Sequence, residues 1–148
     1  MKPNIRNYTS SVNADQSVMN IERKLVMHGS TRIMKEYDGF GNVSAISFQK
    51  QHRTELLSFQ LPAKVDSVHK LFLANKKGRV TDAQRKTLYD QAKRTAWKNI
   101  SDWVDIQMTM IALEQVEFAE VFLPYVLVAP GQTMFNKMNE SGFKALGT

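Results

Sequence analysis

The chain has 148 residues, of which 43% are hydrophobic, and it carries a formal net charge of +6 and no cysteine. This length and hydrophobic content predict one domain with a real core, and the lack of cysteine excludes disulfides and thiolate metal sites. No apolar run approaches the ~18 residues that span a bilayer, and residues 1–17 lack the apolar segment of a signal peptide, so we expect a cytoplasmic protein with no membrane partner.

The first half of the chain predicts one helix followed by a meander of strands. Residues 1–13 are polar and predict a flexible N-terminal arm. An apolar side and a following glycine predict a helix over residues 14–27. Alternating apolar residues predict three strands, over residues 31–38, 43–50 and 54–61. Two glycines within residues 39–42 indicate a hairpin between the first two strands.

The second half predicts helices. Residues 64–75 have one apolar side, and residues 133–139 fit a short helix. Residues 81–116 contain no Gly or Pro and have apolar residues at helical spacing, which predicts one long helix, or two with a slight bend. Thr81 and Gln84 fit a capping box at its start.

The predicted order is α-β-β-β-α-α-α, an α+β fold in which helices cover a small three-stranded antiparallel meander around one long central helix. We expect a single domain over residues 14–140 and a loose C-terminal tail over residues 141–148. The apolar face of the meander is expected to carry Ile46, Phe48, Leu57, Phe59 and Leu61. The opposite face, partly wet, is expected to carry Arg32 or Lys35, Ser44 or Ser47, and Gln60.

The long helix has two neighbouring apolar stripes, which predicts burial on more than one side. The first stripe comprises Tyr89, Ala92, Ala96, Ile100, Trp103 and Met110, and the second comprises Trp97, Val104, Met108 and Ile111. A chain of this size has few other elements to cover both stripes. We therefore predict a homo-oligomer with an interface in residues 103–116 or 118–128.

The excess positive charge belongs to one segment. Residues 70–98 contain nine basic and two acidic residues, a net charge of +7, whereas residues 99–148 have a net charge of −4. This asymmetry predicts a surface that contacts phosphates, with a solvated helix face as the alternative interpretation. The candidate contact residues are Lys76, Lys77, Arg79, Arg85, Lys86, Lys93, Arg94 and Lys98.

Aromatic residues near the predicted hairpin tip extend this hypothesis. Tyr37 and Phe40 are candidates for stacking on bases, although such tips also carry aromatic residues that only pack. We expect Trp97 to be a core residue with a basic rim. The zinc finger, the RNP aromatic signature, the GXXG loop and a clear helix-turn-helix are all missing from the sequence.

No pattern predicts a catalytic residue, a metal site or a cofactor. The three histidines, His28, His52 and His69, lack metal-ligand spacing. Asp102 and Asp105 share a helix face and could hold Mg²⁺ in a nuclease, but no ordered motif supplies the usual acidic and lysine partners. We favour an ion pair between Asp102 and Lys98, four residues earlier.

Several segments resemble a family of small uncharacterised phage and prophage proteins. The likeness lies in RTAWK (94–98), DWVDIQ (102–107) and EVFLPY (120–125), with RIMKEY (32–37) and LPA (61–63) before them, and covers roughly residues 30–125. It implies a phage origin, hence a host-cell cytoplasm, and no settled activity. Separately, the β-β-β-α order with a basic helix is similar, in topology only, to the core of phage single-strand annealing proteins.

Together these features predict a non-enzymatic phage protein that binds nucleic acid, with single-stranded DNA favoured, and that acts in replication, recombination or repair. The alternative is a protein-binding module, such as an inhibitor of a host defence enzyme or an assembly factor, whose partner is a host protein. A nuclease is the third hypothesis.

Overall fold

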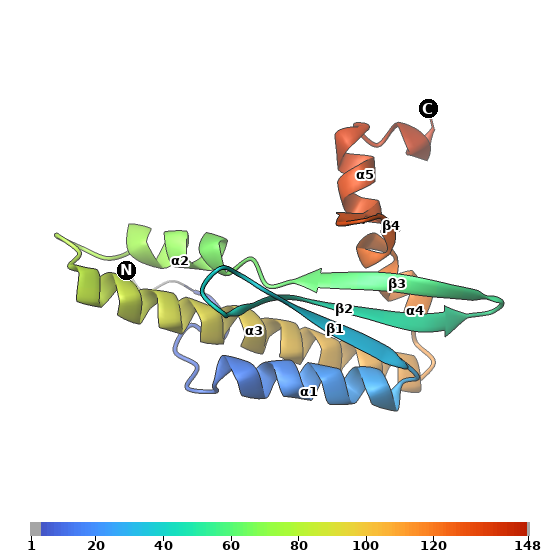
Figure 1. Cartoon of the computed structure of the whole chain (residues 1–148), viewed down its shortest axis with the longest axis horizontal. Coiled ribbons are helices and arrows are strands. Elements are labelled where there is room, and N and C mark those ends of the chain that lie inside the picture. The colour runs from blue at the N-terminus through green and yellow to red at the C-terminus, as the bar shows by residue number, and fades with distance from the viewer. Residues whose placement is uncertain (1–3, 148) are drawn as a thin grey trace. The chain divides into compact units, whose positions relative to one another are not determined.

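The computed structural model describes residues 4–147, and it confirms the α+β fold with a three-stranded antiparallel sheet and one long helix (Figure 1). The chain divides into two compact units. The first comprises residues up to Lys24 together with Ala63–Ile106, and the second comprises Leu25–Pro62 together with the residues from Gln107 onwards. Each unit is described by itself below.

The first three helices of the chain follow the sequence pattern closely. Helix α1 spans Ala14–Met27, as predicted, α2 spans Val65–Ala74, and α3 spans Asp82–Ala112 as one continuous helix. The predicted capping box is present, since the Gln84 backbone N–H donates to Thr81 Oγ1 (3.1 Å) and the Thr81 N–H donates to Gln84 Oε1 (3.0 Å).

The end of α3 differs from the prediction by four residues. The helix ends at Ala112 because Glu114 adopts a left-handed conformation with φ of 58°. The Gln115 N–H then donates to the carbonyl of Met110 (2.9 Å), which is the hydrogen bond of a left-handed helix terminus. A glycine usually occupies this position, so the sequence contained no recognisable stop signal there.

The buried residues of α3 lie mainly along one side of the helix, and the first predicted apolar stripe is only partly buried. Its Ala92 and Ala96 are buried, but its larger residues are half-buried. Trp97 is a core residue, as expected, at 1% exposed, and Val104 and Met108 continue the same line. Two polar residues, Thr95 and Ser101, are also buried on this helix.

The second unit is built on the meander of β1 (Arg32–Tyr37), β2 (Val43–His52) and β3 (Glu55–Pro62). Phe48 lies opposite Phe59 in the register, and the two rings stack with centroids 5.0 Å apart. Helix α4 (Phe118–Phe122) adds the rings of its first and last residues, which meet Phe48 edge-on. The predicted apolar face of the sheet is therefore confirmed as the core of this unit.

The C-terminal part of the second unit contains the short helix predicted over residues 133–139 and several short elements that the sequence did not indicate. After α4 come a 3₁₀ turn η1 (Leu123–Tyr125), strands β4 (Leu127–Ala129) and β5 (Gln132–Thr133), helix α5 (Met134–Glu140) and a 3₁₀ turn η2 (Lys144–Leu146). Strands of three and two residues are too short to show a period-2 pattern. Among residues 4–147, no helix combines the length and apolarity needed to cross a bilayer.

The phenylalanine cluster supplies a test of the fold. Phe122→Ala removes a fully buried ring and should lower the free energy of unfolding by about 3–5 kcal/mol. Phe40→Ala, at a position that is 92% exposed, is the matched control and should change it by about 0.5 kcal/mol or less. Urea unfolding of both variants measures the difference, and equal losses would contradict the assigned core.

Candidate nucleic-acid interface

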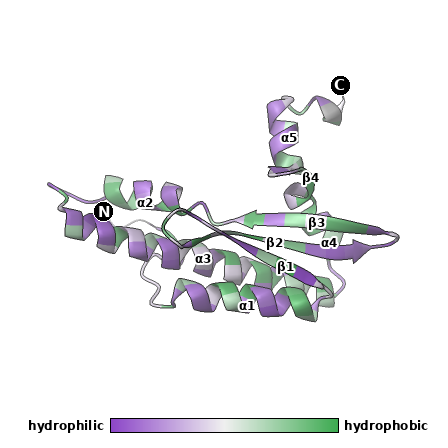
Figure 2. Cartoon of the chain, in the orientation of Figure 1, coloured by the Kyte–Doolittle hydropathy of each residue, from purple (hydrophilic) through white to green (hydrophobic). Residues whose placement is uncertain are grey.

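Five of the eight predicted contact residues form an exposed set that we call the free basic group: Lys76, Lys77, Arg79, Arg85 and Lys86. They lie in the loop between α2 and α3 and in the first turn of α3, a polar part of the chain in Figure 2. Their side chains make no hydrogen bond or ion pair with any residue between 4 and 147. The positive end of the α3 dipole adds to their charge, while Asp82 partly offsets it.

The local sequence explains why these cations gather. Gly78 adopts φ of 81°, a conformation that glycine takes without strain, and this turn returns the chain from α2 to α3. The capping box then starts α3 at Asp82, so the loop cations and the first-turn cations belong to one short stretch of exposed chain. The stretch is rich in long, charged side chains, and none of its residues belongs to the core.

The other three predicted residues are half-buried and already have partners. Arg94 donates from Nε to the Ser10 carbonyl (3.1 Å) and from Nη2 to Gln91 Oε1 (2.6 Å). Lys93 Nζ lies 3.5 Å from Asp90 Oδ1, and Lys98 Nζ donates to Asp102 Oδ1 (2.8 Å). Because these cations are already neutralised or hydrogen-bonded, a phosphate would have to compete for them.

The described part of the N-terminal arm, residues 4–13, makes specific contacts with α3. Thr95 Oγ1 donates to the Asn7 carbonyl (2.8 Å), and Gln91 Nε2 donates to the Ser10 carbonyl (3.1 Å). The first of these bonds satisfies the Thr95 hydroxyl, which belongs to a residue that is completely buried. Buried polar residues within an apolar helix stripe were the one sequence signal that could have indicated a polar segment packed against α3.

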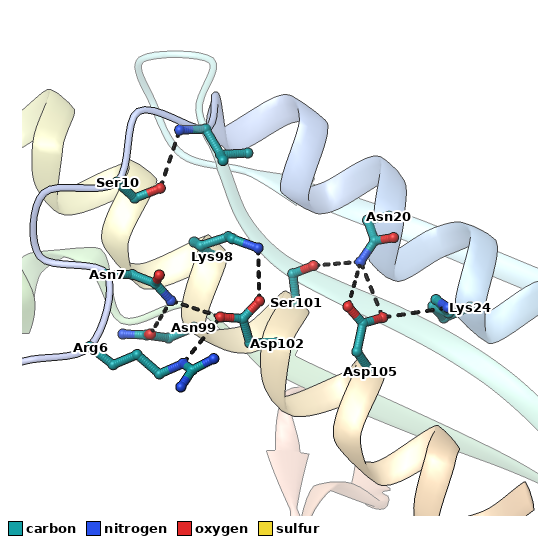
Figure 3. Close-up of polar contacts among 11 residues, drawn as sticks. Arg6, Asn7, Ser10, Asn20, Lys24, Lys98, Asn99, Ser101, Asp102 and Asp105 are labelled. Atoms are coloured by element: carbon teal, nitrogen blue, oxygen red, sulfur yellow. Dashed lines mark hydrogen bonds and ion pairs between the residues drawn. The ribbon is translucent and has the colours of Figure 1, made fainter.

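Asp102 is the centre of a charged network in this unit (Figure 3). The expected pair with Lys98 is confirmed, and two residues of the arm join it: Arg6 Nε lies 3.2 Å and Asn7 Nδ2 2.9 Å from Asp102 Oδ2. Burial alone would raise the pKa of this carboxyl, but hydrogen bonds from Lys98, Asn7 and Arg6 outweigh it and hold the pKa below its ordinary value. The arm residues were missed because they lie more than ninety positions away in the sequence.

Asp105 has partners of its own, so the two aspartates do not form a shared site. Asn20 Nδ2 lies 3.3 Å from both carboxylate oxygens of Asp105, and Lys24 Nζ lies 3.8 Å from one of them (Figure 3). Asn20 also donates to Ser101 Oγ (2.6 Å). Among the residues that the structure describes, no group of three or more His, Asp or Glu could hold a metal ion.

The predicted stacking residues are exposed, and they belong to the second unit. Tyr37 is the last residue of β1 and is 57% exposed, and Phe40 lies in the hairpin turn. The turn is held by Asp38, whose Oδ1 accepts from the Phe40 N–H (2.8 Å). A rigid turn with an exposed ring fits a stacking role, and neither ring is needed by the core.

A hollow of about 330 Å³ in the first unit was not predicted. Its lining includes Tyr8 of the arm, Phe72 of α2, Leu88 of α3 and Lys76 of the free basic group. Tyr8 is half-buried, and it shares the lining of this hollow with Lys76. Tyr8 is the aromatic residue that the sequence analysis missed, because it lies in a segment that we expected to be flexible.

Comparisons of the chain with protein families, with curated proteins and with solved structures found no match.

The Asp102 network predicts a pH-dependent stability. A carboxyl whose pKa is lower in the folded chain stabilises the fold fully above its ordinary value of 3.8, and this contribution is lost as the pH falls from there through the folded-state pKa. Asp102→Asn should therefore lower the free energy of unfolding by about 1–2 kcal/mol at pH 7 and by less near pH 3. Chemical unfolding at both values tests this.

Asp105→Asn is the comparison variant, because this side chain is 40% exposed and its contacts are longer. We expect a smaller loss of stability. Since we assign no nuclease activity, neither substitution should alter nucleic-acid cleavage. Magnesium-dependent degradation of DNA or RNA by the pure protein, lost in either variant, would contradict this interpretation.

Proposed function

We propose that this chain is a non-enzymatic phage protein that binds single-stranded nucleic acid, DNA in preference, through the free basic group. The observation that carries the proposal is the set of five exposed cations at the start of α3 that have no partner among the described residues. The chain as a whole has an excess of six positive charges, and this group alone supplies five cations. Phosphates are the anions that such a surface suits best.

The difference between free and engaged cations supports a defined footprint. A cation already paired with a carboxylate gains little from a phosphate, because one ion pair is exchanged for another. The side chains of the free basic group break no ion pair with a described residue when they bind a phosphate, so we assign the phosphate contacts to them first. Lys93, Arg94 and Lys98, which also hold the arm and the Asp102 network, are assigned a structural role that comes before any contact with nucleic acid.

Base stacking is the second part of the proposal, and it favours single strands. The hollow lined by Tyr8 and Lys76 contains an aromatic residue within the same unit as the phosphate contacts. Bases of a duplex are not available to such a ring, whereas those of a single strand are, and stacking tolerates any sequence. Binding without sequence preference suits a protein of replication, recombination or repair. The alternative is a protein-binding module, and the next experiment distinguishes it from a nucleic-acid-binding protein.

The first prediction concerns charge placement. Replacing Lys77, Arg79 and Lys86 with Glu should abolish binding of an oligodeoxynucleotide and leave the thermal midpoint unchanged, because these exposed side chains have no partner in the described part of the chain. For the wild type, five phosphate contacts predict a slope of log K against log salt of about −3.5. Fluorescence anisotropy across a salt series measures both.

The control replaces Arg23, Lys137 and Lys144 with Glu, all exposed and outside the free basic group. Both triple variants have the same net charge, so a difference in affinity reports the position of the charges and not their sum. Equal loss of affinity would remove the assigned surface. If the wild type binds no single strand at low salt, the protein-binding alternative replaces this proposal.

We also propose that the chain forms a homo-oligomer. In the two predicted interface segments, the large apolar side chains that remain exposed are Ile106, Leu113, Leu123 and Val128. Exposed apolar residues of this kind are covered at subunit interfaces. Light scattering at tens of micromolar should give at least twice the 16.9 kDa mass of one chain, and Leu123→Glu should reduce it. A wild-type monomer at that concentration would refute the assembly.

A further inference from the structure

A groove of about 450 Å³ lies on the face of the β1–β2–β3 sheet that faces away from the phenylalanine cluster. The strand register sets its floor in two rows, the first of Arg32, Gln49 and Ser58 and the second of Met34, Ser47 and Gln60. Leu127 and Pro130 of the same unit complete its lining. The volume is within the range of about 300–1,000 Å³ that small-molecule sites occupy.

Two polar atoms in the floor of this groove have no partner. Ser47 is only 8% exposed, and its Oγ makes no hydrogen bond with the described residues. Gln49 Oε1 is buried and unpaired as well, while its Nε2 donates to Ser58 Oγ (3.3 Å). Whichever end of the amide faces Ser58, the other end remains unsatisfied. Buried polar atoms without a partner are costly, so a bound group that satisfies them would be favoured.

The groove also carries one charge of each sign, on Arg32 and on Glu36. Arg32 is exposed and makes no ion pair within residues 4–147. Glu36, the acidic residue of the described lining, already accepts a hydrogen bond from Gln60 Nε2 (2.8 Å). Arg32 lies directly opposite Gln49 in the register, so the free cation is adjacent to the unsatisfied amide. The groove therefore combines an apolar wall, an unpaired acceptor, a free hydroxyl, a cation beside Gln49 and a carboxylate in a different row of the sheet.

We infer that this groove binds one nucleotide, with the base over Ser47 and Gln49 and the phosphate at Arg32. The amide oxygen of Gln49 needs an N–H donor, which a base edge supplies, and the Ser47 hydroxyl can donate or accept. Met34, Leu127 and Pro130 suit the faces of a flat ring. An aliphatic or aryl carboxylate offers no N–H to Gln49, and a cationic ligand would pair with Glu36 and leave Arg32 without a counterion.

The nucleotide is either free or one unit of a single strand, and the two sources share this chemistry. The inference stands on residues of the second unit, and it does not depend on the free basic group. It assigns the groove a ligand whether or not the first unit contacts phosphates.

Calorimetric titration with adenosine 5′-monophosphate, adenosine, inorganic phosphate and a short oligodeoxynucleotide tests the site. Ser47→Ala should weaken binding of the nucleotide and of adenosine about tenfold, the effect of one lost hydrogen bond. The same substitution removes an unsatisfied buried hydroxyl, so the thermal midpoint should stay the same or rise. Arg32→Gln should weaken the nucleotide about tenfold and leave adenosine unchanged.

Two controls match these variants. Ser44→Ala removes an exposed hydroxyl of the same strand that already donates to the Glu36 carbonyl (3.2 Å), and Arg23→Gln removes an exposed cation of the first unit. Neither should change nucleotide affinity. If the oligodeoxynucleotide binds tightly and the monophosphate weakly, the ligand of the groove is one unit of a single-stranded nucleic acid. If the monophosphate binds more tightly, the ligand is a free nucleotide.

The Lys77, Arg79 and Lys86 to Glu variant separates this inference from the proposed function. It should keep its affinity for adenosine 5′-monophosphate even where oligonucleotide binding is lost. Loss of monophosphate binding in that variant together with full binding by Ser47→Ala would place the nucleotide elsewhere and overturn the inference. So would the lack of any heat of binding with adenosine, the monophosphate and the oligodeoxynucleotide at millimolar concentration.

Discussion

The first unit depends on satisfying the polar groups that α3 buries. Thr95 and Ser101 are enclosed on a helix whose other buried residues are apolar, and neither can reach water. Thr95 bonds to the backbone of the arm, and Ser101 accepts from Asn20 of α1. An unpaired buried hydroxyl costs roughly 1–3 kcal/mol, so the positions of the arm and of α1 follow from these two bonds as much as from apolar packing.

This constraint also divides the cations of the unit. Those in the middle of α3 bind other parts of the protein: Arg94 donates to the carbonyl of Ser10 in the arm, and Lys98 donates to Asp102. Those at the start of α3 and in the loop before it are exposed, and their side chains bind no acid or carbonyl of residues 4–147. A run of basic residues that looks uniform in the sequence thus becomes two sets with different roles. The two sets follow from position along the helix, because only the middle of α3 carries the arm contacts.

The second unit is organised by a different interaction, the contact of four phenylalanine rings from the sheet and α4. Aromatic rings that meet edge-on and stacked at 4.3–6.2 Å contribute more than their buried area alone. Because all four rings use one face of the sheet, the other face keeps its polar side chains, and two of their atoms, Ser47 Oγ and Gln49 Oε1, have no hydrogen-bond partner among the described residues. The same alternation that builds the core therefore creates the second candidate site.

The sequence by itself determined the elements with strong local signals. Helix α1, the three strands, the capping box at Thr81 and the ion pair between Lys98 and Asp102 all follow from contacts within a few residues, so periodicity and spacing predict them. Only the tertiary structure decided which cations are free, that Arg6 and Asn7 join Asp102, and that Ser47 Oγ and Gln49 Oε1 have no partner among the described residues. These features arise from pairing between distant segments and from side-chain burial, and neither leaves a periodic signal along the chain.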